Sequence, residues 1–113
     1  MRKTRSIEYF NNRISKWSAQ KDRCAVTGHY VGLNFHCHHK IPVSKDGTDT
    51  FNNLIIVCSE IHNLIHFVAP CQIEQSLKQL KFSSDFSKKK WKAILLKLNK
   101  LRKIAGMNSI NIK

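Results

Sequence analysis

The sequence predicts a single α+β domain with a short strand–strand–helix core, one helix before it and basic helices after it. Two observations predict this class. The segments "LNFHCHH" (33–39) and "LIIV" (54–57) have the alternation and the short apolar run that are typical of strands. The segments around them repeat apolar residues every three or four positions, which is the spacing of amphipathic helices. A chain of 113 residues has room for one modest core.

The first helix is expected in "SIEYFNNRISKWSAQ" (6–20), where an apolar stripe should dock on the domain. That stripe consists of Ile7, Phe10, Ile14 and Trp17. In the strand at 33–39, alternation should place Leu33, Phe35 and Cys37 on one face and His36 and His38 on the other. Pro42 should end this strand, and the turn formers of "VSKDGTDTFNN" should make the loop to the second strand.

Three helices should follow the second strand. Ser59 is a suitable N-cap for the first, which should hold Ile61, Leu64, Ile65 and Val68 and end before Pro70. The next covers 71–82, and the last runs from 87 to a C-terminal stop at Gly106. The expected organisation is a basic N-terminal helix in 1–23, the core in 24–69, a helical extension in 70–107 and a tail in 108–113.

The charge is high and unevenly distributed. The 20 lysines and arginines exceed the 7 acidic residues by 13, an excess that favours polyanionic partners. Between Cys24 and Cys71 two lysines stand against three acids, whereas nine basic residues and no acid follow Asp85. A nearly neutral centre between basic flanks indicates a site presented to a phosphate backbone. A solvated, solubilising helix face is the alternative interpretation.

Other classes are less favoured by the sequence. No apolar run approaches the roughly 20 residues of a membrane span, and the basic N-terminus leads into no apolar signal core. We therefore expect a cytoplasmic protein with no membrane partner. The four cysteines form no CxxC pair, so free thiols that pack as small apolar groups are expected.

All six histidines lie between His29 and His66. His62 and His66 are four residues apart on a predicted helix, so they project from the same face and can offer two nitrogens to one metal ion. A third ligand can come from His38 or His39, which are adjacent and point in different directions. One of the two can bind metal while the other faces a substrate. His29 and His36 are expected to be satisfied or surface residues.

A pair of histidines in which one binds metal and the other faces the substrate suits the hydrolysis of a phosphodiester. The metal neutralises phosphate charge and stabilises the leaving oxygen, and a neutral imidazole with a pKa of about 6.5 takes a proton from water. By ligand type, an all-imidazole set suits Zn, Ni or Mn better than Mg.

The segment "HCHHKIPVSKDGTDTFNNLIIVCSEIHNLIH" (36–66) resembles the HNH, or ββα-metal, nuclease signature. A His-His pair ends the first strand, an Asn-Leu begins the second, and a His follows nine residues after that Asn. A narrower resemblance, through "NRIS", "CAVTG" and "LNKLRK", covers about residues 8–107 and is to the endonuclease domain of group II intron-encoded reverse transcriptase/maturases. The fold implied is α+β, with a ββα-metal (HNH) core.

The resemblance implies roles for particular residues. His39 would be the general base, and Asn53 would hold it in place through hydrogen bonds to the backbone of the loop. His38, His62 and His66 would bind one divalent metal ion, with Mg expected from the intron enzymes. The activity implied is hydrolysis or nicking of DNA.

Nucleic-acid contacts are expected from the loop and the basic flanks. The candidates are Lys40, Lys45, Arg13, Lys16, Lys89 and Lys92. In the intron setting, the intron RNA and a reverse transcriptase would be supplied separately, because 113 residues cannot hold a polymerase and no YxDD-like motif occurs.

Two further interpretations stay open. One is a non-catalytic nucleic-acid-binding protein that retains the HNH scaffold. The other is a zinc-stabilised interaction domain, in which the histidines and Cys37 or Cys58 close a tetrahedral site.

Overall fold

The computed structural model describes residues 6–110 of the chain. The chain divides into two compact units, Met1–Cys58 and Ser59–Lys113. The division falls between the second strand and the following helix, inside the predicted core. The first unit contains α1 (Ile7–Ala19), β1 (His36–His39) and β2 (Leu54–Val57), and the second contains α2 (Ser59–His66), α3 (Pro70–Ser83) and α4 (Lys88–Ile104).

The two strands of the first unit pair antiparallel, which together with the helices confirms the predicted α+β class. The register pairs His36 with Val57 and His39 with Leu54. Leu54, Ile56 and Val57 of β2 are fully buried, and Ile55 is partly exposed. These apolar side chains anchor β1 through its partner strand, although β1 itself is mostly polar.

β1 is shorter than predicted. Gly32–Asn34 forms a 3₁₀ turn instead of the start of the strand, and Leu33 is 86% exposed. Gly32 has a φ of 63°, a left-handed conformation that turns the chain away from an extended path. Phe35, which was predicted inside the strand, lies directly before it and is buried.

α1 forms as predicted, but its docked face is not the predicted one. Ser6 caps the helix by accepting a hydrogen bond from the Tyr9 backbone N–H at 2.9 Å. Tyr9 is buried, whereas Ile7, Phe10 and Ile14 of the predicted apolar stripe are 80%, 52% and 50% exposed. The prediction for these three residues is therefore wrong.

Specific polar contacts explain why α1 is turned this way. The side-chain amide of Gln20 bonds the backbone of Ile56 twice, accepting from its N–H at 3.0 Å and donating to its carbonyl at 3.0 Å. Nearer the start of the helix, Asn12 Nδ2 donates to the Asp49 carbonyl at 2.9 Å. A buried backbone group without a partner is costly, so these bonds outweigh the burial of a few apolar side chains.

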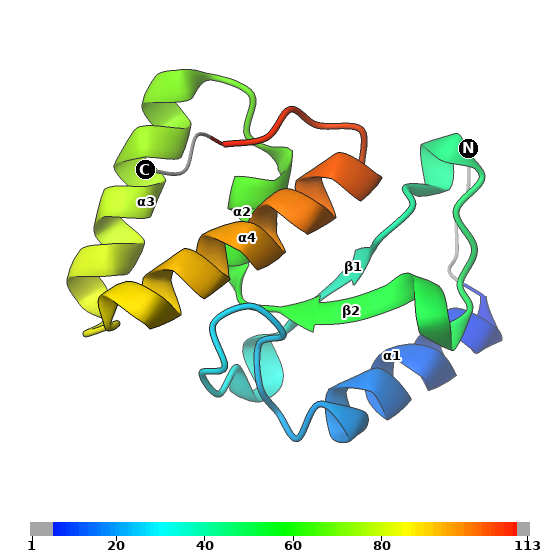
Figure 1. Cartoon of the computed structure of the whole chain (residues 1–113). Helices are drawn as coiled ribbons and strands as arrows, with labels where there is room; N and C mark the ends of the chain where they lie inside the picture. Colours follow the sequence, from blue (N-terminus) through cyan, green and yellow to red (C-terminus); the bar gives the residue numbers. More distant parts are fainter. Residues whose placement is uncertain (1–5, 111–113) are drawn as a thin grey trace. The chain divides into compact units, whose positions relative to one another are not determined.

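In the second unit, α2 packs against both α3 and α4 (Figure 1). α2 begins at Ser59, the residue predicted to be its N-cap, but it ends at His66, and Val68 is 75% exposed rather than part of its apolar face. The Arg102 guanidinium donates to the carbonyls of Leu64 at 2.6 Å and Phe67 at 2.8 Å. These bonds satisfy the terminal carbonyls of α2, so a side chain from α4 closes this helix.

The last two helices follow the predicted boundaries closely. Pro70 occupies the first turn of α3, and Ser87 caps α4 by accepting from the Lys90 N–H at 3.1 Å. Gly106 follows α4 with a φ of 86°, which is the left-handed conformation expected of a C-terminal stop. The buried side of α4 consists of Ile94, Leu95, Leu98, Leu101 and Arg102.

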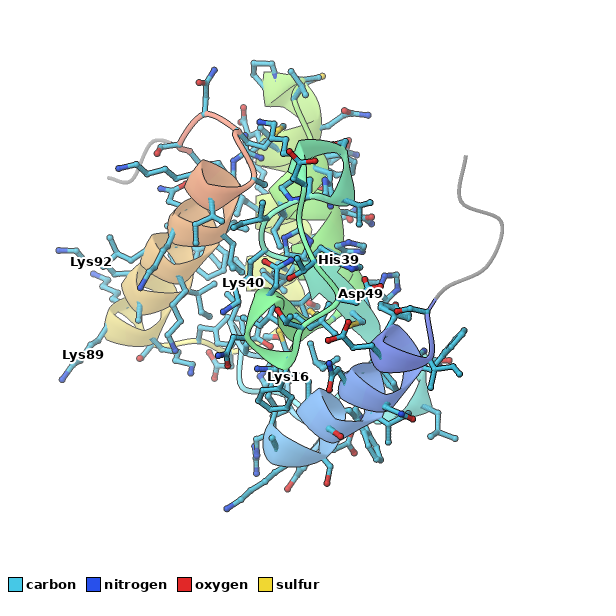
Figure 2. The ribbon with its side chains drawn as sticks, turned by 90° about the vertical axis from the view of Figure 1, so that its right-hand side faces the viewer. Lys16, His39, Lys40, Asp49, Lys89 and Lys92 are labelled. Carbon is cyan, nitrogen blue, oxygen red and sulfur yellow. The ribbon has the colours of Figure 1, made fainter. Side chains whose placement is uncertain are left out.

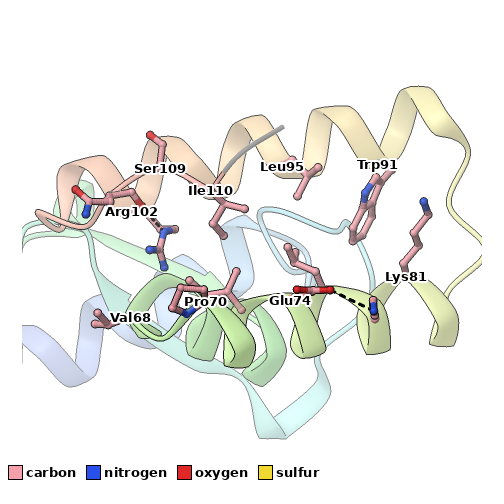
Figure 3. A pocket seen from close by; sticks show the side chains of 13 residues that line it. Val68, Pro70, Glu74, Lys81, Trp91, Leu95, Arg102, Ser109 and Ile110 are labelled. Carbon is pink, nitrogen blue, oxygen red and sulfur yellow. Dashed lines mark hydrogen bonds and ion pairs between the residues drawn. The ribbon is translucent and has the colours of Figure 1, made fainter. Parts of the chain in front are cut away.

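A groove of about 740 Å³ lies along α3 and α4 in the second unit (Figure 3). Trp91, Leu95 and Ile110 line it, and an ion pair between Glu74 and Lys78 at 3.3 Å lies at its edge. None of the residues predicted for catalysis or metal binding lines this groove. Within residues 6–110, no helix has the length and apolar character needed to cross a bilayer.

Candidate active site and metal ligands

The two histidines at the end of β1 differ in burial. Neighbouring strand residues point to opposite faces, and accordingly His38 is 3% exposed whereas the His39 side chain is 11% exposed. The register sets them opposite Ile55 and Leu54. The alternation of the strand therefore directs the two adjacent imidazoles to opposite faces of the sheet.

His39 is paired with Asp49, a residue whose role is not evident from the sequence. Its Nε2 lies 2.8 Å from Asp49 Oδ1, and Figure 2 shows the two side chains next to each other. The second carboxylate oxygen, Oδ2, accepts a hydrogen bond from the Ser6 hydroxyl at 2.6 Å. Both oxygens of Asp49 thus have a hydrogen-bonding partner, and the residue is only 9% exposed.

The ring of His39 is also held by an aromatic contact. Tyr9 stacks on it with 5.5 Å between ring centroids and an interplanar angle of 6°. Because Ser6, Tyr9 and Asn12 all belong to the first turns of α1 or its cap, the N-terminal end of this helix forms one wall around His39. Its ring orientation is therefore determined from two sides.

Asn53 closes the loop between the strands. Its Oδ1 accepts from the Ile41 N–H at 2.9 Å, and its Nδ2 donates to the carbonyls of Ile41 at 3.1 Å and Thr48 at 2.8 Å. The Lys40 N–H donates to the Asn53 carbonyl at 2.8 Å, which continues the pairing one step beyond β1. The side-chain amide of Asn53 thus binds the backbone of Ile41, two residues after His39.

The tip of the same loop depends on Gly47. Its N–H donates to the Pro42 carbonyl at 2.9 Å, and the preceding Asp46 has a φ of 66°. A Cβ at position 47 would overlap the carbonyl of Ile41. Only glycine fits at position 47. The turn that it permits places Asp49 next to the His39 imidazole.

In the second unit, α2 carries His62 and His66 one turn apart. Their ring centroids are 4.9 Å apart, with an interplanar angle of 77°. The buried face of the helix holds Ile61, Leu64 and Ile65, which leaves His62 half-buried and His66 exposed. The i, i+4 spacing thus brings two imidazoles together as predicted.

Three histidines of the described chain could each offer one ring nitrogen to a metal ion, namely His38, His62 and His66. An all-imidazole donor set is compatible with divalent transition metals, and it leaves coordination positions for water or phosphate. His39 is not one of the three. The chemistry of this donor set therefore fits a divalent cation.

The predicted basic contacts of the first unit are partly engaged within the protein. The Arg13 guanidinium lies 4.3 Å from the centroid of the Phe35 ring, and Lys16 Nζ lies 3.6 Å from that of Phe51. Burial lowers the pKa of Lys16 below its ordinary value, and the positive charge of Lys40 lowers it further. Lys16 and Lys40 are thus two neighbouring cations, labelled in Figure 2.

The other predicted contacts are exposed. Lys45 lies in the loop of the first unit, and Lys89 and Lys92 lie at the start of α4, where Figure 2 shows them directed outward. Arg102 differs from the other basic residues of α4, because it is 3% exposed and bonded within the protein. It cannot contribute to a surface that binds phosphates.

The cysteines are free thiols, as predicted. Cys24 is buried, and hydrogen bonds from the Cys58 thiol and from Thr27 lower the pKa of Cys24 to about 5. The thiols of Cys24 and Cys58 therefore interact within the first unit.

Comparisons with known proteins agree with this geometry. Residues 22–67 match the family model described as HNH endonuclease. The match includes both strands and α2, and so includes the histidine pair, Asn53 and His62. Searches of curated proteins and of solved structures give no match.

Proposed function

We propose that this chain is a metal-dependent DNA endonuclease in which His39 is the general base. The family match over residues 22–67 carries the proposal, because the motif residues occupy the expected elements of the fold. A His-His pair ends β1, an Asn precedes β2, and a His lies on α2. The members of the matched family are endonucleases by description, and this chain offers the side chains that such a reaction needs.

His39 would take a proton from the attacking water through its Nδ1. Its Nε2 is bonded to Asp49, which leaves the other ring nitrogen for this transfer. Asn53 would keep His39 in place by holding the backbone of the following residues. The stacked ring of Tyr9 would limit rotation of the imidazole.

His38, His62 and His66 would bind one divalent ion. Such an ion would neutralise charge on the scissile phosphate and stabilise the leaving oxygen. The half-buried and exposed positions of His62 and His66 would allow access from solvent. Zn, Ni and Mn suit the imidazole ligands, and Mg suits the intron enzymes that the sequence resembles.

DNA is the proposed substrate because of the distribution of positive charge. Lys16 and Lys40 are neighbouring cations near His39, and an anionic phosphate would relieve their mutual repulsion. The exposed lysines of α4, which include Lys89 and Lys92, would contact more of the backbone. Lys45 would add a contact from the loop.

A narrower proposal rests on the resemblance of the flanking segments to group II intron proteins. In that setting the chain would nick one target strand to provide a primer. An intron RNA and a reverse transcriptase would be separate partners. Plasmid topology distinguishes a nick from a double-strand cut.

The test is a nicking assay on supercoiled plasmid with Mg, Mn, Zn and Ni in parallel, with wild type and His39→Ala. We expect metal-dependent nicking by wild type and a loss of about 10²–10⁴-fold in His39→Ala, the usual contribution of a general base. His29→Ala is the matched control, since His29 is exposed and lies away from the histidine pair in the sequence. It should nick like wild type.

Metal binding separates the two proposed roles. Titration calorimetry should give weaker binding for His62→Ala and unchanged binding for His39→Ala. Binding of plasmid without cleavage by any of the four metals would contradict the endonuclease proposal and favour a non-catalytic nucleic-acid-binding protein, which the net charge of +13 also suits.

A further inference from the structure

We infer that Asp49 is a positioning residue that sets the tautomer and ring orientation of His39. The inference rests on the proposed role of His39 as the base. It assigns to Asp49 an action through His39 rather than on DNA or metal.

The contacts of Asp49 are those of a fixed acceptor. Oδ1 lies 2.8 Å from His39 Nε2, and Oδ2 accepts from the Ser6 hydroxyl at 2.6 Å. The Ser6 oxygen in turn accepts from the Tyr9 N–H at 2.9 Å, so its own proton points to Asp49. The backbone carbonyl of Asp49 is bound by Asn12. α1 therefore holds both ends of this residue.

This arrangement determines where the proton of a neutral imidazole resides. One ring nitrogen then carries hydrogen and the other accepts, and a carboxylate can only accept. With Asp49 at Nε2, the hydrogen lies on Nε2 and the lone pair lies on Nδ1. A base needs that lone pair, and the opposite tautomer would have a hydrogen at Nδ1 instead.

Burial strengthens the effect. Asp49 and the His39 side chain are 9% and 11% exposed, so water competes little for the bond. Tyr9 stacks on the free face of the imidazole and leaves the ring little room to turn. The pair is thus fixed before any substrate arrives.

The experiment compares Asp49→Asn with wild type in two measurements. The first is the tautomer of His39, read from nitrogen-15 shifts of its ring in the metal-free protein. Wild type should carry its hydrogen on Nε2, and the Nδ1–H form should gain population in Asp49→Asn, whose amide can donate to Nε2. The second is the single-turnover nicking rate at saturating protein, which should fall about 10- to 100-fold, as for other partners that orient a histidine.

Two variants separate positioning from stability. Asp46→Asn is the same change at an exposed position of the same loop and should alter neither measurement. Ser6→Ala weakens the cap of α1 but leaves the Asp49 carboxylate on His39, so it should lower the unfolding temperature while wild-type tautomer persists. Metal affinity and DNA affinity should stay unchanged in Asp49→Asn, which places the loss in the chemical step.

The outcomes distinguish this inference from the proposed function. If wild type nicks, His39→Ala does not, and Asp49→Asn matches wild type in both rate and tautomer, the inference is overturned and the base assignment stands. A wild type that never nicks contradicts the proposed function, yet a tautomer change in Asp49→Asn still supports the positioning role. An Nδ1–H tautomer in wild type overturns the inference whatever the activity.

Discussion

Asn53 and Ile41 form a reciprocal pair of hydrogen bonds across the loop between the strands. The amide oxygen of Asn53 accepts from the Ile41 N–H at 2.9 Å, and its nitrogen donates to the Ile41 carbonyl at 3.1 Å. This geometry imitates the pairing of two strands at a point where β1 has already ended. One side chain thus extends the sheet and fixes the chain directly after His39.

Asn53→Asp should destabilise the protein by about 2–4 kcal/mol, because a carboxylate oxygen would replace the donor that faces the carbonyls of Ile41 and Thr48. The nicking rate should fall as well, since the loop after His39 loses its brace. Urea unfolding measures the first effect and the plasmid assay the second. Asn52→Asp, an exposed neighbour, should stay within about 0.5 kcal/mol of wild type. Equal stability of the two variants would contradict this prediction.

Arg102→Leu should destabilise the second unit by about 2–4 kcal/mol, because it leaves the carbonyls of Leu64 and Phe67 without their donor. Arg102→Lys should recover only part of the loss, since one ammonium cannot reproduce the fork of a guanidinium. Thermal unfolding followed by circular dichroism gives the ranking. Lys103→Leu, next in sequence and exposed, is the control and should have little effect. A similar loss in both leucine variants would show that α4 charge, not the helix cap, matters.

The lowered pKa of Cys24 predicts that the stability of the protein depends on pH. Hydrogen bonds from Cys58 and Thr27 lower its pKa from 9.0 to about 5 in the folded state. An acid whose folded pKa is depressed stabilises the fold above its unfolded pKa, and this contribution is lost as pH falls through the folded pKa. Under reducing conditions, wild type should therefore lose more stability between pH 9 and pH 5 than Cys24→Ala does.

Urea unfolding at several pH values in that range tests the Cys24 prediction. Cys71→Ala, at an exposed cysteine, should follow wild type. Parallel pH profiles for wild type and Cys24→Ala would mean that Cys24 keeps its proton throughout.

The lysines at the start of α4 predict a change in the salt dependence of DNA binding. Each phosphate contact contributes about 0.9 to the slope of log affinity against log salt. The double variant Lys89→Ala/Lys92→Ala should therefore bind more weakly and have a shallower slope, by about 0.9 for each contact removed. Fluorescence anisotropy with duplex DNA measures both. Lys78→Ala on α3, where the lysine is paired with Glu74, should leave the slope unchanged.

Local patterns in the sequence were sufficient for much of the fold. The C-terminal stop at Gly106 acts on the backbone next to it, so it can be recognised without a structure. The strand at 54–57 and the i, i+4 histidines of α2 depend likewise on neighbours in sequence. The class of fold and the histidines of the motif follow from such signals.

Contacts between distant residues could not be predicted. The apolar stripe of α1 favoured Ile7, Phe10 and Ile14 as the docked face, but hydrogen bonds from Asn12 and Gln20 to residues more than thirty positions away turn the helix the other way. Arg102 counted as one more basic residue until its carbonyl partners were known. The role of such a polar residue can be assigned only when the partner that lies near it in space is known.

The sequence alone determined which chemical groups this protein offers: paired imidazoles, a bracing amide and an excess of positive charge, in an order that resembles HNH nucleases. Only the tertiary structure decided which group acts on which. The carboxylate of Asp49 lies ten residues beyond His39 in a loop of turn formers, where it has the appearance of a turn residue. The turn at Gly47 and the N-terminus of α1 bring it to the ring nitrogen, and hydrogen bonds of this kind depend on distance and angle rather than on spacing in the chain.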